Sequence, residues 1–325
     1  MLRLPVRWPV VATLSLLTWP VLACADSEAD EGGGEEITSG ASVAQEPGAE
    51  PQTLSLFGEP LYPMEDTTGA IDEADQALAQ DPENVELIIA AGRVRRNYWQ
   101  YREAIDLYSR AMELAPNDWR PYRFRGHRHI SLRDFEQAIK DLERARGLAP
   151  LNWDVSYHLG LAYFLAGRFA DAAREYGRCL ALSSDPGARQ AQSDGFRSCS
   201  QNHADPESRV AMTEWAVRAS MRAGMVDMAS RLLEGLPSDL EIGENLAYYH
   251  DLLFYKGEKT SEELLNPGPD GPYRKETVGY GVANWMIVQG DTSRAIGLLE
   301  ELVEDPWWPG FGRISAEVEL FRLTR

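Results

Sequence analysis

Small, aromatic and proline residues recur along this chain at a fixed interval of 34 residues. The same register holds over three successive units, and the repeated positions are Gly92, Gly126 and Gly160; Tyr101, Phe135 and Phe169; Ala104, Ala138 and Ala172; and Pro82, Pro116 and Pro150. Self-similarity with a period of about 20–50 residues is typical of proteins built from stacked structural repeats. We therefore predict a repeat architecture for most of the chain.

Each unit predicts two helices joined by a short turn. In the first unit these helices are "VELIIAAGRVRRNYWQ" and "YREAIDLYSRAMELAP". Small residues such as Gly126 and Ala138 let the two helices of a pair approach closely, and a proline ends each unit because it cannot continue a helix. A single pair cannot bury its own apolar stripe, so we expect the pairs to stack into an all-α solenoid.

This unit resembles the tetratricopeptide repeat (TPR), and the resemblance is strong over residues 85–186, which hold three units. The resemblance implies a right-handed superhelix of helix pairs whose concave face binds peptides or protein segments. A weaker similarity continues further along the chain, where "MRAGMVDMASRLL" at 221–233 aligns with "FLAGRFADAAREY" at 164–176. We therefore expect residues 208–325 to hold divergent TPR-like units and a C-terminal capping helix.

Two segments depart from the repeat. Residues 53–84 are expected to form an N-terminal cap, in which a proline-interrupted, extended or looped segment precedes one helix. Residues 187–207 form an insertion that breaks the 34-residue interval. Near the C-terminus, Trp307 and Trp308 precede the capping helix, and we expect them to pack in the core rather than to bind a ligand.

The N-terminal residues have the composition of an export signal followed by a tether. Residues 1–23 show the layout of a signal peptide, with a basic start, an apolar run and small residues at its end. The apolar run is shorter than the ~20 residues that a membrane span needs. Residues 24–52 carry acids but no base and no aromatic residue, so they are expected to form a disordered acidic tether.

Two cleavage sites are compatible with this signal. "VLAC" at 21–24 resembles the lipobox of bacterial lipoproteins, which implies lipidation of Cys24 and anchoring in the cell envelope, most simply at the outer membrane. "ACA" at 23–25 instead fits an ordinary signal-peptidase site, which would give a soluble periplasmic or secreted protein. We prefer the lipoprotein, because a flexible tether between an acyl anchor and a folded domain makes physical sense.

The charge balance restricts the possible partners. The 325 residues include 32 Lys and Arg against 51 Asp and Glu, a formal charge of −19. Binding to nucleic acid or anionic lipid depends on neutralisation of phosphates by Lys and Arg, so we predict no such affinity. Against this acidic background, residues 120–134, "RPYRFRGHRHISLRD", concentrate positive charge.

The TPR resemblance places the first helix of each pair on the concave face. The side chains predicted to line a partner-binding groove there are Arg93, Arg96, Arg120, Arg123, His127, Tyr157, Leu161 and Phe164. Arginine can bind a carboxylate through two hydrogen bonds, so the basic part predicts an acidic partner segment, and the aromatic part would hold its apolar residues. In the alternative interpretation, the arginines of this region pair with acids of adjacent helices and are structural.

The cysteines suggest a disulfide. If Cys24 is acylated, Cys179 in a predicted helix and Cys199 in the insertion remain. An even pair in an exported protein favours a disulfide between them. The alternative is a buried free thiol at Cys179 and a separate thiol in the insertion.

The sequence contains no recognisable catalytic or metal-binding motif. The histidines do not have the spacing of zinc sites, and neither a nucleophile elbow nor a phosphate-binding loop is present. We therefore predict a non-catalytic adaptor of the cell envelope, without cofactor or metal, that binds segments of partner proteins. The alternative from another functional class is an enzyme subunit built on a helical solenoid.

Overall fold

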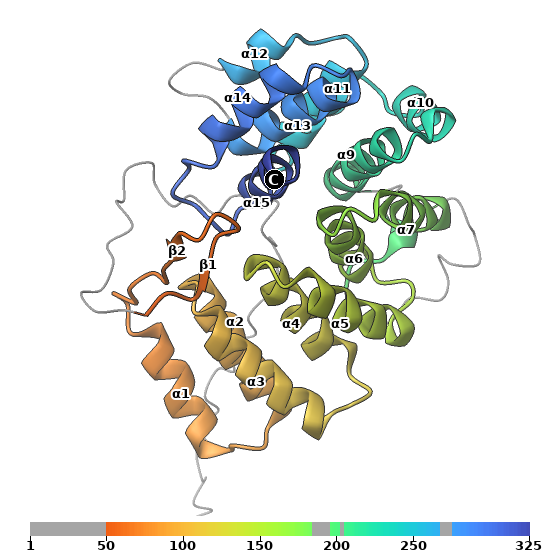
Figure 1. The fold of residues 1–325 in the computed structure, drawn as a ribbon. Helices are drawn as coiled ribbons and strands as arrows, with labels where there is room; N and C mark the ends of the chain where they lie inside the picture. Colours follow the sequence, from red (N-terminus) through yellow and green to blue (C-terminus); the bar gives the residue numbers. More distant parts are fainter. Residues whose placement is uncertain (1–49, 184–195, 202–204, 267–274) are drawn as a thin grey trace, which may run out of the picture.

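The computed structural model describes residues 50–183, 196–201, 205–266 and 275–325. The predicted signal peptide, Cys24, nearly all of the tether and most of the insertion lie outside these ranges. The described chain is mostly helical, and its helices pack in adjacent pairs along a curved array (Figure 1). The expected all-α solenoid of helix pairs is therefore confirmed.

Three helix pairs occupy the strong repeats, after a single helix α1 (Ala70–Gln80). They are α2 (Val85–Asn97) with α3 (Tyr101–Leu114), α4 (Trp119–Ser131) with α5 (Phe135–Leu148), and α6 (Trp153–Leu165) with α7 (Phe169–Leu182). Within each pair a glycine permits close contact: a Cβ atom on Gly160 would overlap the ring of Tyr176. This contact is the physical reason for the glycine column in the sequence.

The first helix of each strong pair also has a side-chain cap. Asn84, Asp118 and Asn152 precede α2, α4 and α6, and each accepts a hydrogen bond from a backbone N–H in the first helical turn. Such caps typically stabilise a helix by about 1 kcal/mol. They recur at the same interval of 34 residues and form a further column of the repeat.

The divergent part continues the array with three more pairs. They are α9 (Pro206–Arg222) with α10 (Val226–Glu234), α11 (Leu246–Tyr255) with α12 (Ser261–Leu265), and α13 (Lys275–Val288) with α14 (Thr292–Leu302). The second helix of the middle pair, α12, has only 5 residues. Glu262 stands there in place of the alanine that lets the second helix pack closely in the strong repeats.

The described part of the insertion is linked to the third repeat by a disulfide and by hydrogen bonds. The short 3₁₀ helix η1 (Cys199–Gln201) carries Cys199, which forms a disulfide with Cys179 of α7. Beside it, the backbone N–H of Trp153 donates to the carbonyl of Arg197 over 2.9 Å. The expected disulfide is thus present, and it joins the insertion to the helix pair that precedes it.

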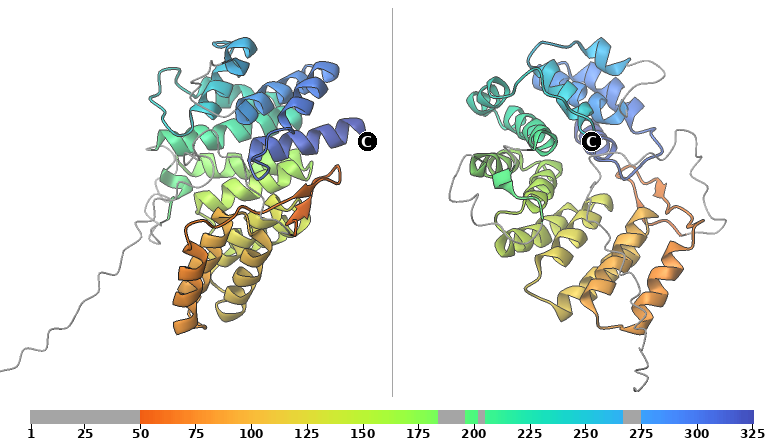
Figure 2. Two further views of the ribbon diagram at one scale, coloured as in Figure 1. Left: turned by 90° about the vertical axis from the view of Figure 1, so that its left-hand side faces the viewer. Right: turned by 180° about the vertical axis from the view of Figure 1, so that it is seen from behind.

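The last helix, α15 (Phe311–Thr324), packs on α13 and α14 but also lies inside the curve of the array (Figures 1 and 2). All residues from Phe311 to Leu320 are buried. The sequence predicted a cap at the end of the solenoid, and α15 does more than that, because its residue Phe311 also packs on His127 of α4 and Tyr157 of α6. Its charged residues can be buried because they form ion pairs, for example Glu319 with Arg222 of α9 over 2.9 Å.

The N-terminal segment forms a small antiparallel hairpin. Its strands are β1 (Thr53–Leu54) and β2 (Pro60–Leu61), with Thr53 opposite Leu61. The hairpin lies between the first repeats and the start of α15, where a hydrophobic cluster joins the two ends of the described chain (Figure 1). The buried members of this cluster are Leu61, Trp99, Tyr101 and Trp308. Trp308 is therefore a core residue, as expected.

Candidate functional site

The concave groove predicted from the sequence is occupied by the protein itself. The ring of Phe311, at the start of α15, lies 5.1 Å from that of His127 and 6.4 Å from that of Tyr157. The side chains of Arg123, His127, Tyr157, Leu161 and Phe164 were predicted to contact a partner, and each residue is at most 3% exposed. The expectation of an open groove at these residues is therefore corrected, because α15 and the divergent repeats cover them.

The aromatic part of the predicted groove is instead an interface with the divergent repeats. The Tyr157 hydroxyl accepts a hydrogen bond from the indole of Trp215 in α9 over 3.0 Å and donates one to the Tyr248 hydroxyl of α11 over 3.2 Å. The ring of Phe164 packs at 5.4 Å from Trp215. Burial raises the pKa of Tyr157 well above its usual value, so its hydroxyl stays protonated.

The arginines of residues 120–134 are largely engaged with acids. Arg123 is buried and forms an ion pair with Asp154 of α6. Arg125 binds both carboxylate oxygens of Asp141 over 2.7 Å. Arg120 binds the carboxylates of Glu86 and Asp118 nearer the surface. These contacts agree with the structural interpretation of the arginine-rich stretch.

Two of the predicted groove arginines remain partly exposed on α2. The guanidinium of Arg93 lies 6.0 Å from the ring centre of Phe124, and Arg96 donates to the side chain of Asn97 over 3.2 Å. These arginines keep some accessible surface, but the aromatic residues predicted to share a groove with them are buried.

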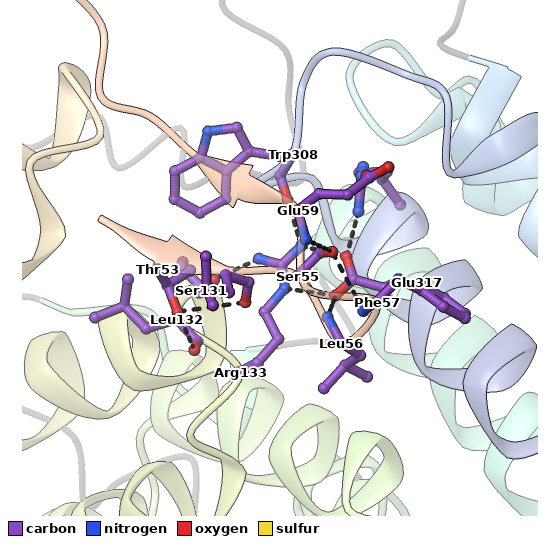
Figure 3. Close-up of polar contacts among 12 residues, drawn as sticks. Thr53, Ser55, Leu56, Phe57, Glu59, Ser131, Leu132, Arg133, Trp308 and Glu317 are labelled. Carbon is purple, nitrogen blue, oxygen red and sulfur yellow. Dashed lines mark hydrogen bonds and ion pairs between the residues drawn. The ribbon is translucent and has the colours of Figure 1, made fainter. Parts of the chain in front are cut away.

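A second constellation, which the sequence did not reveal, joins the two ends of the array. We call it the clasp, and it consists of the β1–β2 hairpin, the α4–α5 turn with Arg133, and the α14–α15 loop together with Glu317 of α15 (Figure 3). The guanidinium of Arg133 bonds to the carboxylate of Glu317 over 2.7 Å and to the carbonyl of Trp308 over 3.1 Å. Arg133 and Glu317 are separated by 184 positions in the sequence.

The hairpin completes the clasp through backbone hydrogen bonds. The N–H of Leu56 donates to the carboxylate of Glu317 over 2.8 Å, and the hydroxyl of Thr53 donates to the carbonyl of Leu132 over 3.3 Å (Figure 3). The indole N–H of Trp308 donates to the carbonyl of Tyr62 over 2.9 Å. The hairpin therefore contacts both the second repeat and the last helix.

Arg133 of the clasp and Trp99, the equivalent position in the α2–α3 turn, have an unusual backbone conformation. Trp99 and Arg133 adopt positive φ angles of 57° and 66°, a left-handed conformation that is unfavourable for residues with a Cβ atom. In the next repeat the equivalent position is Gly167, whose φ is 78°. The Trp99 ring packs at 5.7 Å from Trp308, so both strained positions carry side chains that hold the C-terminal part. A tryptophan and an arginine in a column that favours glycine were the sequence signal that could have revealed the clasp.

The charges of the clasp favour an ionised Glu317. Burial alone would raise the pKa of this carboxyl, but the charge and hydrogen bonds of Arg133, the N–H of Leu56 and the charge of Arg313 together hold its pKa below the usual value. Arg313 also pairs with Glu317 within α15. The buried carboxylate is thus stabilised by two cations and a backbone donor.

An open cavity of about 540 Å³ lies beside the clasp, between the hairpin, the end of α14 and the start of α15. Its apolar walls include Phe57, Leu61, Tyr62, Val303 and Leu320, and its ionised groups include Glu59, Glu300, Glu304, Arg313 and Glu317. This volume falls within the range of about 300–1,000 Å³ that is typical of ligand-binding pockets. We call this cavity the clasp pocket.

Another cluster of ionisable residues lies deep in the divergent repeats. Arg218 of α9 pairs with Glu214 and, over 2.7 Å, with Asp251 of α11, and all three residues are fully buried. Burial raises the pKa of Glu214 to about 7 although Arg218 opposes this shift. The i,i+4 spacing of Glu214 and Arg218, on either side of the apolar residues Trp215, Ala216 and Val217, was a signal for this pair in the sequence.

The described residues offer neither a metal-binding cluster nor a membrane-spanning helix. Among them, no cluster of three or more His, Cys, Asp or Glu side chains is arranged to hold a metal ion. Nor does any helix in the described ranges combine the length and the apolar character needed to cross a bilayer. The predicted lipidation site, Cys24, lies outside these ranges.

Comparisons with known proteins agree with the repeat. The family model of the tetratricopeptide repeat matches residues 125–189. Small glutamine-rich tetratricopeptide repeat-containing protein 2 of Saccharomyces cerevisiae is 31% identical over 85 residues, which are 26% of this chain and 25% of that protein. BBSome complex member BBS4 of Bos taurus is 29% identical over 106 residues, 32% of this chain and 20% of that protein. This chain thus matches only about a quarter or less of the length of these curated relatives.

The comparison with solved structures also finds a repeat protein. A tetratricopeptide repeat protein from Parabacteroides merdae superimposes with a TM-score of 0.49 at 15% identity, covering 78% of this chain and 90% of that one. The family match at residues 125–189 coincides with part of the second and third helix pairs described above. Over residues 125–189 the chain is therefore similar to tetratricopeptide repeat proteins.

Proposed function

We propose that this protein is a non-catalytic adaptor that holds a segment of a partner protein, and that the segment binds in the clasp pocket. The observation that carries this proposal is that Phe311 of α15 packs on His127 of α4 and Tyr157 of α6, while an open cavity of about 540 Å³ lies beside the clasp. Repeats of this type commonly present extended binding surfaces to proteins. Because its own last helix occupies the usual concave surface, the partner is directed to a surface that α15 helps to build.

We further propose that the adaptor is exported and anchored by a lipid on Cys24 in a bacterial cell envelope, with the outer membrane as its site. The support is the layout of residues 1–23, the sequence "VLAC" and the acidic composition of residues 24–52. The hairpin of the clasp begins at Thr53, directly after the tether, so the proposed binding site lies close in sequence to the proposed anchor.

Site-specific photo-crosslinking tests the proposed binding site. A photoreactive amino acid would replace Phe57, which is 37% exposed and lines the clasp pocket. The control would carry the same group at Val226, which is 67% exposed on α10 and lies on a distant part of the array (Figure 1). We expect a discrete protein adduct in intact cells at Phe57 and none at Val226. Absence of an adduct at Phe57, or the same adduct at both positions, would contradict the proposed site.

A further inference from the structure

We propose that the clasp pocket binds a basic segment, in which a lysine or arginine lies next to apolar residues. This inference rests on the proposed function and names the chemistry of its partner. The sequence suggested an acidic partner segment, whereas the structure favours a basic one. The arginines assigned to partner binding are largely engaged with acids of the same chain, while carboxylates line the open cavity.

The walls of the pocket favour the apolar part of such a segment. Phe57 is 37% exposed and its ring packs at 5.7 Å from Phe321, so an aromatic edge borders the cavity. Tyr62 and Val303 are partly buried and also line it. Binding is stabilised when a partner side chain removes apolar surface of this kind from water. Aromatic faces also attract cations such as lysine and arginine.

The ionised groups of the pocket leave negative charge open to solvent. Glu59 of the hairpin, Glu300 of α14 and Glu304 after α14 are exposed and line the cavity. Within the described residues, the side chains of these three glutamates form no hydrogen bond or ion pair. The neighbouring Glu301 differs, because its carboxylate pairs with Lys275 over 2.9 Å.

The cation inside the pocket does not cancel this charge. Arg313 is buried and pairs with Glu317, which also binds Arg133. Glu317 compensates one of these two positive charges, and Glu59 also acts electrostatically on Arg313. The lining of the cavity still has five carboxylates, Glu59, Glu300, Glu304, Asp305 and Glu317, against the single base Arg313. The three exposed glutamates come from both sides of the cavity, from the hairpin and from the end of α14, so a cation that enters the pocket meets carboxylates on either side.

The tether cannot supply that cation. Residues 24–52 precede the hairpin directly and contain no lysine or arginine. The whole chain carries a formal charge of −19, so a second copy would also be repelled in general. Charge complementarity therefore favours a basic segment of a different protein.

A defined pair of peptides tests this inference. The probe is a fluorescein-labelled octapeptide of alternating lysine and leucine, and its matched control has glutamate in place of lysine. Anisotropy titrations would compare the wild-type protein with a triple variant, Glu59→Gln, Glu300→Gln and Glu304→Gln. We expect the lysine peptide to bind at least about tenfold more weakly to the triple variant, since it loses three charge interactions. Added salt should weaken its binding to the wild type for the same reason.

The control variant is Glu301→Gln. Glu301 lies in α14 next to Glu300, but its carboxylate pairs with Lys275 and does not line the pocket. Binding by this variant should equal that of the wild type. All the substituted glutamates are exposed, so the variants should keep their fold, which circular dichroism verifies. Equal binding of the lysine peptide to the wild type and the triple variant, or failure of this peptide to bind, would overturn the inference.

The two proposals can fail separately. If the adduct at Phe57 forms but its partner segment contains no lysine or arginine, and the triple variant captures it equally well, the binding site stands and the charge inference is wrong. If the lysine peptide binds in the expected way but no adduct forms at Phe57 in cells, the pocket has the inferred chemistry and the proposed cellular function is wrong.

Discussion

Arg120, Arg123 and Arg125 stand close together in the sequence, yet each has a different environment. Arg120 contacts acids near the surface, Arg125 is half-buried against Asp141, and Arg123 is buried with Asp154. Exposed ion pairs typically contribute about 0–1 kcal/mol, whereas breaking a buried pair costs about 3–5 kcal/mol because it leaves an uncompensated charge. The same residue type therefore has different energetic importance at these positions.

Arg123→Glu should destabilise the protein strongly. The new carboxylate would be buried next to Asp154, and we expect the free energy of unfolding to fall by about 3–5 kcal/mol. Urea denaturation followed by circular dichroism measures this loss. The control, Arg144→Glu on the exposed side of α5, should have a small effect. If Arg123→Glu instead unfolds with the same urea midpoint as the wild type, the hypothesis that Arg123 binds a partner segment would be restored.

The buried pair of carboxylates around Arg218 should make stability depend on pH. Burial raises the pKa of Glu214 from 4.5 to about 7, so the folded protein keeps a proton there that the unfolded chain has lost. The folded state then binds more protons between about pH 4.5 and 7, and the free energy of unfolding falls as pH rises through this window. Asp251, whose pKa burial also raises, acts in the same direction.

Glu214→Gln should reduce this pH dependence, because glutamine does not ionise. Urea midpoints measured across the same window for the variant and the wild type would show it. Glu262 is exposed, so Glu262→Gln serves as the control and should leave the slope of urea midpoint against pH unchanged. An identical slope in Glu214→Gln and the wild type would show that Glu214 does not hold the proton.

Among the elements, the hairpin and α15 depend on each other although they lie at opposite ends of the described chain. The hairpin adds a backbone donor to Glu317 and covers the indole of Trp308, while α15 gives the hairpin a surface to pack on. A two-stranded hairpin of this size is only marginally stable by itself. The left-handed backbone at Trp99 and Arg133 is tolerated because contacts across the clasp compensate for it.

Removal of the hairpin should loosen α15. A variant that begins at residue 63 loses the hydrogen bonds from Leu56 to Glu317 and from Trp308 to Tyr62, and we expect stability to fall by about 2 kcal/mol or more. Hydrogen exchange should become faster in α15 and stay unchanged in α10. A variant that begins at residue 50 is the matched control. Unchanged exchange in α15 would show that its docking does not need the hairpin.

For the whole molecule, the clasp changes the character of the solenoid. In an open array each repeat contacts only its neighbours, and stability is roughly a sum over repeats and their interfaces. Here Arg133 and Glu317 join parts of the chain that are 184 positions apart, and α15 contacts the second and third helix pairs as well as the last one. The described chain is therefore closed on itself, which favours cooperative unfolding.

The proposed anchor is also a property of the whole molecule, and it has a direct test. Cys24→Ser should abolish incorporation of labelled palmitate and release the protein from membranes, whereas the wild type should incorporate the label. The physical reason is that a membrane anchor depends on acyl chains that insert into the bilayer. A mature N-terminus at Asp26 in the wild type, found by mass spectrometry, would show instead that the protein is cleaved as an ordinary secreted one.

The sequence by itself determined the helix pairs. Their limits depend on local features, namely small residues at close contacts, prolines at the ends of units and the apolar stripe of each helix, and all of these repeat every 34 residues. The disulfide between Cys179 and Cys199 was also predictable, because assigning Cys24 to lipidation leaves one pair of cysteines in neighbouring segments.

Only the tertiary structure decided what lies on the inner side of the array. The position of α15 depends on contacts between residues far apart, such as Phe311 with His127 and Glu317 with Arg133, and no local pattern encodes such pairings. The prediction of a groove assumed that positions outside the apolar columns face solvent. Arg123 and His127 are polar yet buried, because Asp154 neutralises the first and Phe311 packs on the second. Polar residues can enter a core wherever another part of the chain supplies a partner, and only the folded structure shows which part does so.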